Sequence, residues 1–143
     1  MVITRTIRLE ANPLENEYHV HIIDITHEVQ ELVAGTDIRN GTVTVFVPGS
    51  TAAISTIEYE PGLLSDFQDM WERNVPENII YNHKFQGSEN NGYSHVRASL
   101  LGPSLVVPFA DRRLILSSYQ QVVLVDFDNR PRSRQVILQI MGE

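Results

Sequence analysis

Residues 121–140 read QVVLVDFDNRPRSRQVILQI, and this stretch indicates the class of fold. Its first part is rich in β-branched residues. In its last part Val136, Leu138 and Ile140 alternate with side chains that face the other way. A period of two in such residues is typical of half-buried antiparallel strands. Residues 128–131 (DNRP) have turn chemistry, which predicts that the last two strands form a hairpin.

The same alternation extends outward from this stretch and predicts further strands. It appears around Val20 and Ile22, and again over residues 43–47, 52–59 and 114–116. The chain has 143 residues, of which 42% are hydrophobic and 20% are charged. A chain of this length and composition can bury a core of its own, so we expect a single domain over residues 1–143.

Two segments change to a helical period. Val29, Leu32 and Val33 recur at i, i+3 and i+4 after Thr26, whose hydroxyl is expected to cap the first helix. A second helix is expected to begin near Gly62 and to end before a proline, with an apolar stripe made by Leu63, Leu64, Phe67, Met70 and Trp71. The fold class is therefore α+β.

Residues 76–93 lack either period and are rich in Asn, Gly and Ser, which predicts a long loop. Long loops in compact domains often carry function. His83 lies within this loop and His95 follows it. Two neutral imidazoles could bind a divalent metal or transfer protons, whereas each taken singly could simply be a hydrogen-bonded structural residue.

Two further groups of polar residues are candidates for a site. Gly49-Ser50-Thr51 follows a predicted strand and could offer amides and hydroxyls to a phosphate, or could form an ordinary turn. Glu58 and Glu60 are two residues apart on a predicted strand and so share a face. They could bind a metal or act in acid–base chemistry, or they could be solvated charges at a strand edge.

The charge and the cysteine content argue against several classes of protein. The net charge is −7 and no basic run is present, so nucleic-acid binding is not expected. Arg5, Arg8 and Glu10 interrupt the apolar residues at the N-terminus, which argues against a signal peptide. No stretch approaches the roughly 20 apolar residues of a membrane span. We expect a cytoplasmic protein that does not bind membranes, and the lack of cysteine excludes thiolate chemistry.

Taken together, three stretches resemble the YjbQ-like family. They are GTVTVFVPGSTAAISTIEYEPG (41–62), YNHKFQGSENNGYSHVRASLLGPSLVVPF (81–109) and YQQVVLVDFDNRPRSRQVILQIMGE (119–143). The upstream segment IIDITHEVQELVAGTDIRNG (22–41) is also similar to the family's first helix. The resemblance implies an antiparallel β-sandwich or curled sheet with two flanking helices. It also implies a homotrimer with sites near the subunit contacts.

The resemblance implies a chemistry as well. Some members are described as secondary thiamine-phosphate synthases, which join a pyrimidine diphosphate to a thiazole phosphate and release pyrophosphate, normally with Mg²⁺. By position, the family's site residues correspond here to Ser50, Thr51, Glu58, His83, Asn91 and His95. The chain departs from the family pattern at Gly49 and Tyr93, where relatives can carry histidines.

These departures leave two kinds of site open. His83 and His95 remain as ligands for a divalent metal, Mg²⁺ or Zn²⁺, but Asn91 stands where many relatives have an aspartate. Alternatively Ser50, Thr51, Arg97 and the two histidines would bind an anion such as a phosphate. The expected function is that of an enzyme acting on a phosphorylated small molecule, with His83, His95 and Glu58 as catalytic residues. The alternative is a non-catalytic trimeric module that binds an anion or a metal.

Overall fold

The computed structural model describes residues 1–83 and 90–143. Its larger sheet has the strand order β1-β8-β3-β5-β6, and its smaller sheet has the order β2-β7-β4. All neighbouring strands are antiparallel. The strands of the larger sheet are β1 (Val2–Ala11), β3 (Gly41–Phe46), β5 (Ser104–Ala110), β6 (Arg113–Leu114) and β8 (Arg132–Gly142). Those of the smaller sheet are β2 (His21–Asp24), β4 (Ala52–Ile57) and β7 (Gln121–Asp126).

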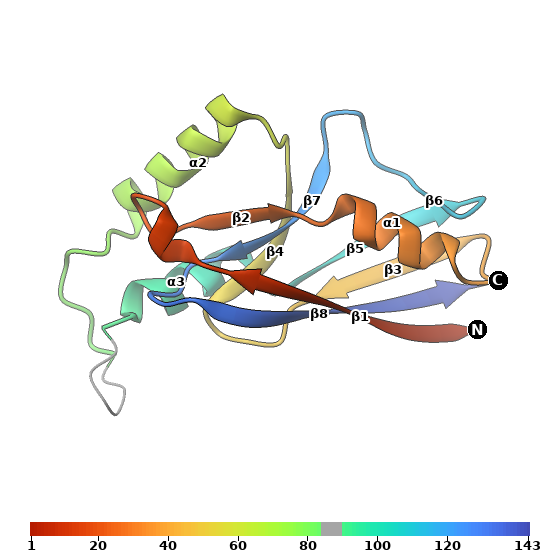
Figure 1. The fold of residues 1–143 in the computed structure, drawn as a ribbon, viewed down its shortest axis with the longest axis horizontal. Helices are drawn as coiled ribbons and strands as arrows, with labels where there is room; N and C mark the ends of the chain where they lie inside the picture. Colours follow the sequence, from red (N-terminus) through yellow and green to blue (C-terminus); the bar gives the residue numbers. More distant parts are fainter. Residues whose placement is uncertain (84–89) are drawn as a thin grey trace.

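The helices lie on the smaller sheet and at one end of the larger one (Figure 1). They are α1 (Thr26–Ala34), α2 (Pro61–Asn74) and α3 (Gly92–Leu101), and a short 3-10 helix η1 spans Pro13–Glu15. The α+β class and the curled antiparallel sheet expected from the sequence are confirmed. Among the described residues there are three α-helices, so the expectation of two was wrong. None of these helices is long and apolar enough to cross a bilayer.

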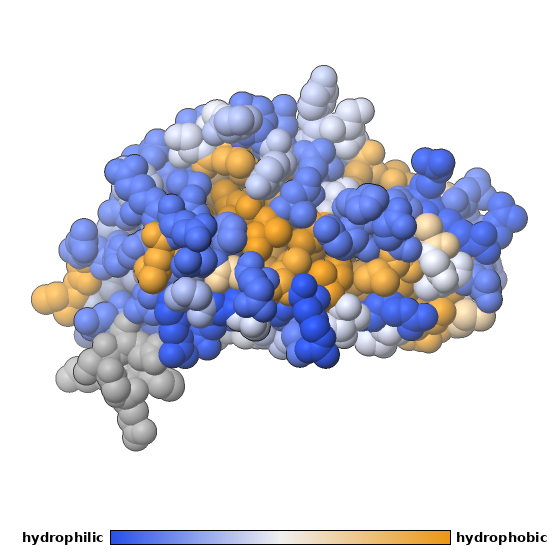
Figure 2. Space-filling view, in the orientation of Figure 1, coloured by the Kyte–Doolittle hydropathy of each residue, from blue (hydrophilic) through white to orange (hydrophobic). Residues whose placement is uncertain are grey.

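The smaller sheet is buried on both faces, because two cores lie against it. Val122 and Leu124 of β7 face the larger sheet and α1, whereas Val123 and Val125 face α2 and α3. This arrangement explains why β7 is an almost uninterrupted apolar run. β1 and β2 are edge strands of different sheets, and Figure 2 shows apolar surface over the region between them.

The predicted hairpin between the last two strands is wrong. β7 already has β2 and β4 on its two edges, so the chain must leave the smaller sheet after Asp126. It crosses to the larger sheet, where β8 pairs with β1 and β3. The connection from β3 to β4 also crosses between the sheets, and the Phe127 N–H donates to the Thr51 carbonyl where the β3–β4 and β7–β8 crossings meet.

The start of α1 also differs from the prediction. The residue before the helix is Ile25, which makes no side-chain cap. The Thr26 hydroxyl instead donates to Asp24 Oδ1 at 2.6 Å and accepts from the Val122 N–H at 2.9 Å. Thr26 therefore ties the helix to the smaller sheet.

At α2, the carboxylate of Glu60 accepts from the Gly62 and Leu63 N–H groups. Glu60 is thus the N-cap of α2 and does not form a carboxylate pair with Glu58 on a strand. The stripe of α2 packs on the sheet as expected, with Trp71 buried and Leu64, Phe67 and Met70 partly buried against the same core. The expected long loop is free of helix and strand over residues 76–83 and 90–91, and its residues 84–89 lie outside the described part.

Candidate functional site

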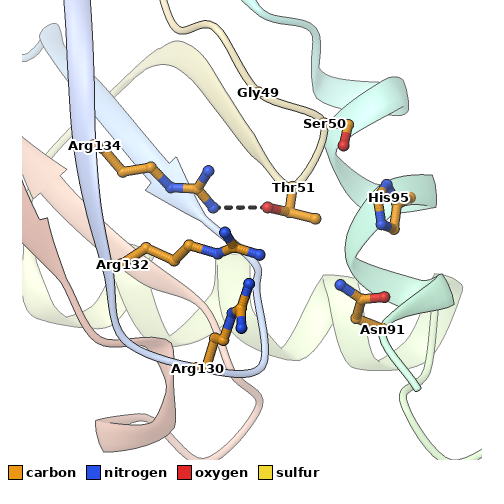
Figure 3. Close-up of a pocket in the computed structure, with 8 residues that line it drawn as sticks. All are labelled: Gly49, Ser50, Thr51, Asn91, His95, Arg130, Arg132 and Arg134. Carbon is orange, nitrogen blue, oxygen red and sulfur yellow. Dashed lines mark hydrogen bonds between the residues drawn. The ribbon is translucent and has the colours of Figure 1, made fainter. Parts of the chain in front are cut away.

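A pocket of about 310 Å³ lies where the β3–β4 and β7–β8 connections meet the first turn of α3. Figure 3 shows side chains from the loop before β4, from the start of α3, and from the β7–β8 crossing and the first residues of β8 pointing toward one another. We refer to this pocket as the arginine pocket. Its lining residues are Gly49, Ser50, Thr51, Asn91, His95, Arg130, Arg132 and Arg134.

Arg134 is held by a buried carboxylate. Its Nε and Nη2 donate to the two oxygens of Asp126 at 2.6 and 3.0 Å, and Nη2 also donates to Thr51 Oγ1 at 2.7 Å. The Asp126 side chain is fully buried, and that of Arg134 is 7% exposed. A bidentate ion pair of this kind fixes the plane of the guanidinium as well as its position. The orientation of Arg134 in the pocket is therefore set before any ligand arrives.

Asp128 connects most of the remaining polar groups. It accepts from Arg132 Nε at 2.5 Å, from Thr51 Oγ1 at 3.1 Å, from Asn91 Nδ2 at 3.3 Å and from the Asn129 N–H at 2.8 Å. Burial by itself would raise the pKa of Asp128, but hydrogen bonds from Asn129, Asn91 and Arg132 outweigh it and lower that pKa. Asp128 is therefore ionised at neutral pH. Three guanidinium groups line the pocket, and two of them, those of Arg132 and Arg134, pair with the carboxylates of Asp128 and Asp126.

Gly49 leaves room for the guanidinium of Arg134. Its φ of +147° favours glycine, and a Cβ at this position would lie 3.1 Å from Arg134 Nη1. A larger residue would thus compete for the space that Arg134 occupies. This gives a physical reason why the chain has Gly49 where the resemblance led us to look for a histidine.

His83 and His95 come together, as the sequence predicted. Their ring centroids are 4.5 Å apart and the planes are tilted by 45°. His95 lies on α3 one turn after Asn91, and its ring lines the arginine pocket. Burial lowers the pKa of His95, and the neighbouring His83 lowers it further, while Asp128 acts in the opposite direction. His95 is therefore mainly neutral at pH 7.

A metal fits this set of residues poorly. Among the described residues, no group of three or more His, Cys, Asp or Glu side chains is placed to hold an ion. The carboxylates of Asp126 and Asp128 are already paired with Arg134 and Arg132. Glu89, which stands between His83 and His95 in the sequence, lies outside the described residues. The side chains around His95 suit an anion better than a cation.

Arg97 does not line the arginine pocket. Its side chain is fully buried on the other side of α3, where Nε donates to the Val75 carbonyl at 3.0 Å and Nη1 to the Tyr18 carbonyl at 2.9 Å. Its guanidinium also lies over the ring of Tyr93, 5.0 Å from the centroid. We expected Arg97 to contact the ligand, but it has a structural role. Its guanidinium donates to backbone carbonyls away from the pocket.

Tyr93 and Glu58 also lie away from the pocket. Tyr93 is fully buried, its hydroxyl contacts His19 Nδ1 at 3.1 Å, and burial raises its pKa to about 12. Glu58 is exposed and follows the last residue of β4, whereas Thr51 precedes the first residue of that strand. The length of β4 therefore separates Glu58 from the pocket, and the structure does not bring it to the other site residues.

The residues that sequence reasoning missed are the three arginines and the two aspartates. A signal for them was present in the sequence. Asp126 and Asp128 are two residues apart, and so are Arg130, Arg132 and Arg134. This spacing places alternate side chains of an extended chain on one face, so two carboxylates and three guanidinium groups could have been expected to meet.

Comparison with known proteins places this chain in a protein family. The model of the family described as "UPF0047 protein YjbQ-like" matches residues 10–143. A UPF0047 protein of Methanothermobacter thermautotrophicus is 37% identical over 131 residues, which are 92% of this chain and 90% of that protein. A UPF0047 protein of Archaeoglobus fulgidus is 37% identical over 128 residues, covering 90% of this chain and 97% of the relative.

Solved structures agree with the fold. A YbjQ-like protein of unknown function from Sulfolobus solfataricus has a TM-score of 0.86 and 26% identity, with all of both chains covered. A hypothetical protein from Aeropyrum pernix has a TM-score of 0.82 and 27% identity, over 97% of this chain and 99% of the other. None of these descriptions states an activity, so the function must be argued from the pocket.

Proposed function

This chain belongs to the YjbQ-like (UPF0047) family, and from the side chains of its arginine pocket we propose that it binds a phosphorylated small molecule. The observation that carries the proposal is the convergence of Arg130, Arg132 and Arg134 with the Thr51 hydroxyl around one concave space. Guanidinium groups bind phosphate oxygens through paired, charge-assisted hydrogen bonds, which makes arginine the preferred residue for such sites.

The hydrogen bonds of Arg132 support this proposal. Asp128 engages only the Nε atom of Arg132, and no partner of its two terminal nitrogens appears within residues 1–83 and 90–143. These nitrogens point toward Thr51 and the centre of the pocket (Figure 3). The carboxylate therefore orients Arg132 and leaves donors for a ligand.

The size and charge of the molecule favour a small ligand over a polymer. The pocket of about 310 Å³ is at the small end for ligand sites. The protein as a whole has a net charge of −7, which repels an extended polyanion, while three guanidinium groups line the pocket. A single phosphate or diphosphate group on a small molecule meets both conditions.

Titration calorimetry with inorganic phosphate and pyrophosphate tests the proposal. We expect Arg132→Gln to weaken binding by roughly tenfold to a hundredfold, since each hydrogen bond to a charged group contributes about 1.5–3 kcal/mol. Arg39→Gln is the matched control, because Arg39 pairs with Asp111 at an exposed position elsewhere. Absence of binding by the unmodified protein, or equal binding by the two variants, would refute the proposal.

The thiamine-phosphate synthase reaction is the specific activity that the resemblance implied. A pocket with three arginines would stabilise the leaving pyrophosphate, which carries most of the charge that develops in that reaction. Purified protein would be assayed with the pyrimidine diphosphate, the thiazole phosphate and Mg²⁺. Turnover that falls in Arg132→Gln supports the reaction in this pocket. Binding without turnover of these substrates would favour the non-catalytic anion-binding module.

A further inference from the structure

His95 lines the arginine pocket, in which we propose that a phosphate binds. Its ring lies across the arginine pocket from Arg132, between Ser50 above it and Asn91 below it in Figure 3. Thus a phosphate held by the arginines would present its phosphorus atom toward an imidazole. The proposed binding function alone assigns no role to this ring.

The ionisation of His95 suits a nucleophile. The charged or titratable groups that act on it are His83, Asp128 and Arg132. Burial, His83 and Arg132 lower the pKa of His95, and Asp128 opposes them without reversing the direction. The ring is therefore mainly neutral at pH 7 and keeps a lone pair on one nitrogen.

The arginines remove the main obstacle to attack by that lone pair. A phosphate monoester carries negative charge that repels an approaching nucleophile. Guanidinium groups placed around the phosphoryl oxygens neutralise this charge and stabilise the transition state without reorganisation. Arg134 is already fixed by Asp126, and Arg132 by Asp128, so this electrostatic arrangement is built into the fold.

From this geometry we infer that His95 is the nucleophile of a phosphoryl transfer, and that the protein hydrolyses a phosphate monoester through a phosphohistidine. The inference rests on the proposed binding of phosphate in the arginine pocket. It adds a reaction, a covalent intermediate and a role for the His95 imidazole.

The reaction balances without an oxidant or a further reactant. In the first step a nitrogen of His95 bonds to phosphorus, and the bond between phosphorus and the ester oxygen breaks. The leaving oxygen takes a proton from a solvent water molecule, and an alcohol departs. In the second step water attacks phosphorus, the bond to His95 breaks, and inorganic phosphate leaves. The proton that water loses neutralises the hydroxide left by the first step.

The first test follows heavy-oxygen-labelled inorganic phosphate. Reversible formation of the phosphohistidine releases a phosphate oxygen as water, so the full-length protein is expected to wash the label into solvent. We expect His95→Gln to slow this exchange by about a hundredfold or more, as removal of a nucleophile does. Arg39→Gln should match the unmodified protein.

The second test traps the intermediate and checks folding. Protein mixed with p-nitrophenyl phosphate is quenched in alkali, and mass spectrometry should find one phosphoryl group on His95. His95→Ala supplied with free imidazole should recover turnover, which a merely structural role would not allow. Melting curves and phosphate titrations establish whether each variant folds and binds.

The outcomes separate the two proposals. If the unmodified protein binds phosphate but shows neither exchange nor trapped phosphohistidine, the inference is overturned and the binding function stands. If it does not bind phosphate, the binding function falls first. If His95→Gln still exchanges phosphate oxygen with water, another residue is the nucleophile and the assignment of His95 is overturned.

Discussion

At the residue scale, the arginine pocket depends on two buried aspartates. Asp126 and Asp128 are fully buried, and each is compensated by an arginine and by neighbouring donors. Burying a carboxylate is costly unless it is paired and hydrogen-bonded, so these contacts are needed for folding as well as for the pocket. The same contacts aim Arg132 and Arg134 at the space that a ligand would enter.

His95 gives a prediction about pH. Its pKa in the folded protein is below the ordinary value of 6.5, mainly because of burial. Below that value the unfolded chain binds more protons than the folded one, so the free energy of unfolding should decrease as the pH falls from 6.5 to the lowered pKa. Urea titrations across this window should show the decrease in the unmodified protein and a smaller one in His95→Gln. Parallel curves for the two proteins would contradict the prediction.

Bound phosphate should oppose this effect. An anion beside His95 favours the protonated ring and so raises its pKa. Phosphate is therefore expected to stabilise the unmodified protein more strongly at pH 6 than at pH 8, measured by the shift in melting temperature. His95→Gln should show a smaller difference between the two pH values.

At the scale of elements, α3 is the part of the fold that sequence periodicity did not reveal. Its buried residues include Ser94 and Arg97, which read as solvent-exposed positions in the sequence. The Ser94 hydroxyl donates to the Phe127 carbonyl at 2.6 Å, and Arg97 donates to two further carbonyls. An apolar stripe is therefore absent, although the helix is packed against the smaller sheet.

Arg97 provides a test of this structural role. Replacement by leucine removes the donors to the Val75 and Tyr18 carbonyls and the partner of Glu72. We expect the free energy of unfolding to fall by about 3–5 kcal/mol, as when one member of a buried ionic contact is lost. The affinity for phosphate should stay unchanged in the folded fraction, measured by calorimetry at low temperature. A selective loss of phosphate binding would return Arg97 to the ligand site.

At the scale of the whole molecule, the outer face of the larger sheet lacks charge over three neighbouring rows of residues. The pairing register places these rows side by side on four strands. Their members are Val2, Met141, Thr42 and Pro108; Thr4, Gln139, Thr44 and Val106; and Thr6, Ile137, Phe46 and Ser104. Val106 is 59% exposed, Met141 46% and Phe46 40%. An uncovered, uncharged sheet face of this kind is typical of a surface that contacts another protein chain.

We predict that this face contacts a second copy of the chain within the homotrimer that the resemblance implied. Light scattering after size-exclusion chromatography should give the mass of three chains at micromolar concentration. Val106→Asp places a charge in the middle of the face and should shift the protein to a smaller species, because a charge cannot be buried there without a partner. Arg113→Asp, which changes charge on the neighbouring β6, is the control. A monomeric unmodified protein would refute the prediction.

The sequence by itself determined the α+β class, most of the strands, the amphipathic helix α2 and the meeting of His83 with His95. Periodicity and motif order depend only on neighbours along the chain and on patterns of burial, and both can be read from residue types. The strands β1 and β5, the helix α3 and the change of sheet between β7 and β8 could not be read in this way. They follow from which strand edges are already paired. They also follow from buried polar side chains that donate hydrogen bonds to carbonyls far away in the sequence.

Only the tertiary structure decided the composition of the pocket. It joined Thr51 and Asn91 with Arg130 from the crossing after β7 and with two arginines at the start of β8, and it separated Glu58 and Arg97 from them. The reason is that the β3–β4 and β7–β8 crossings lie side by side, where the Phe127 N–H donates to the Thr51 carbonyl. Contacts between residues far apart in the chain are set by this packing, which local sequence patterns do not specify.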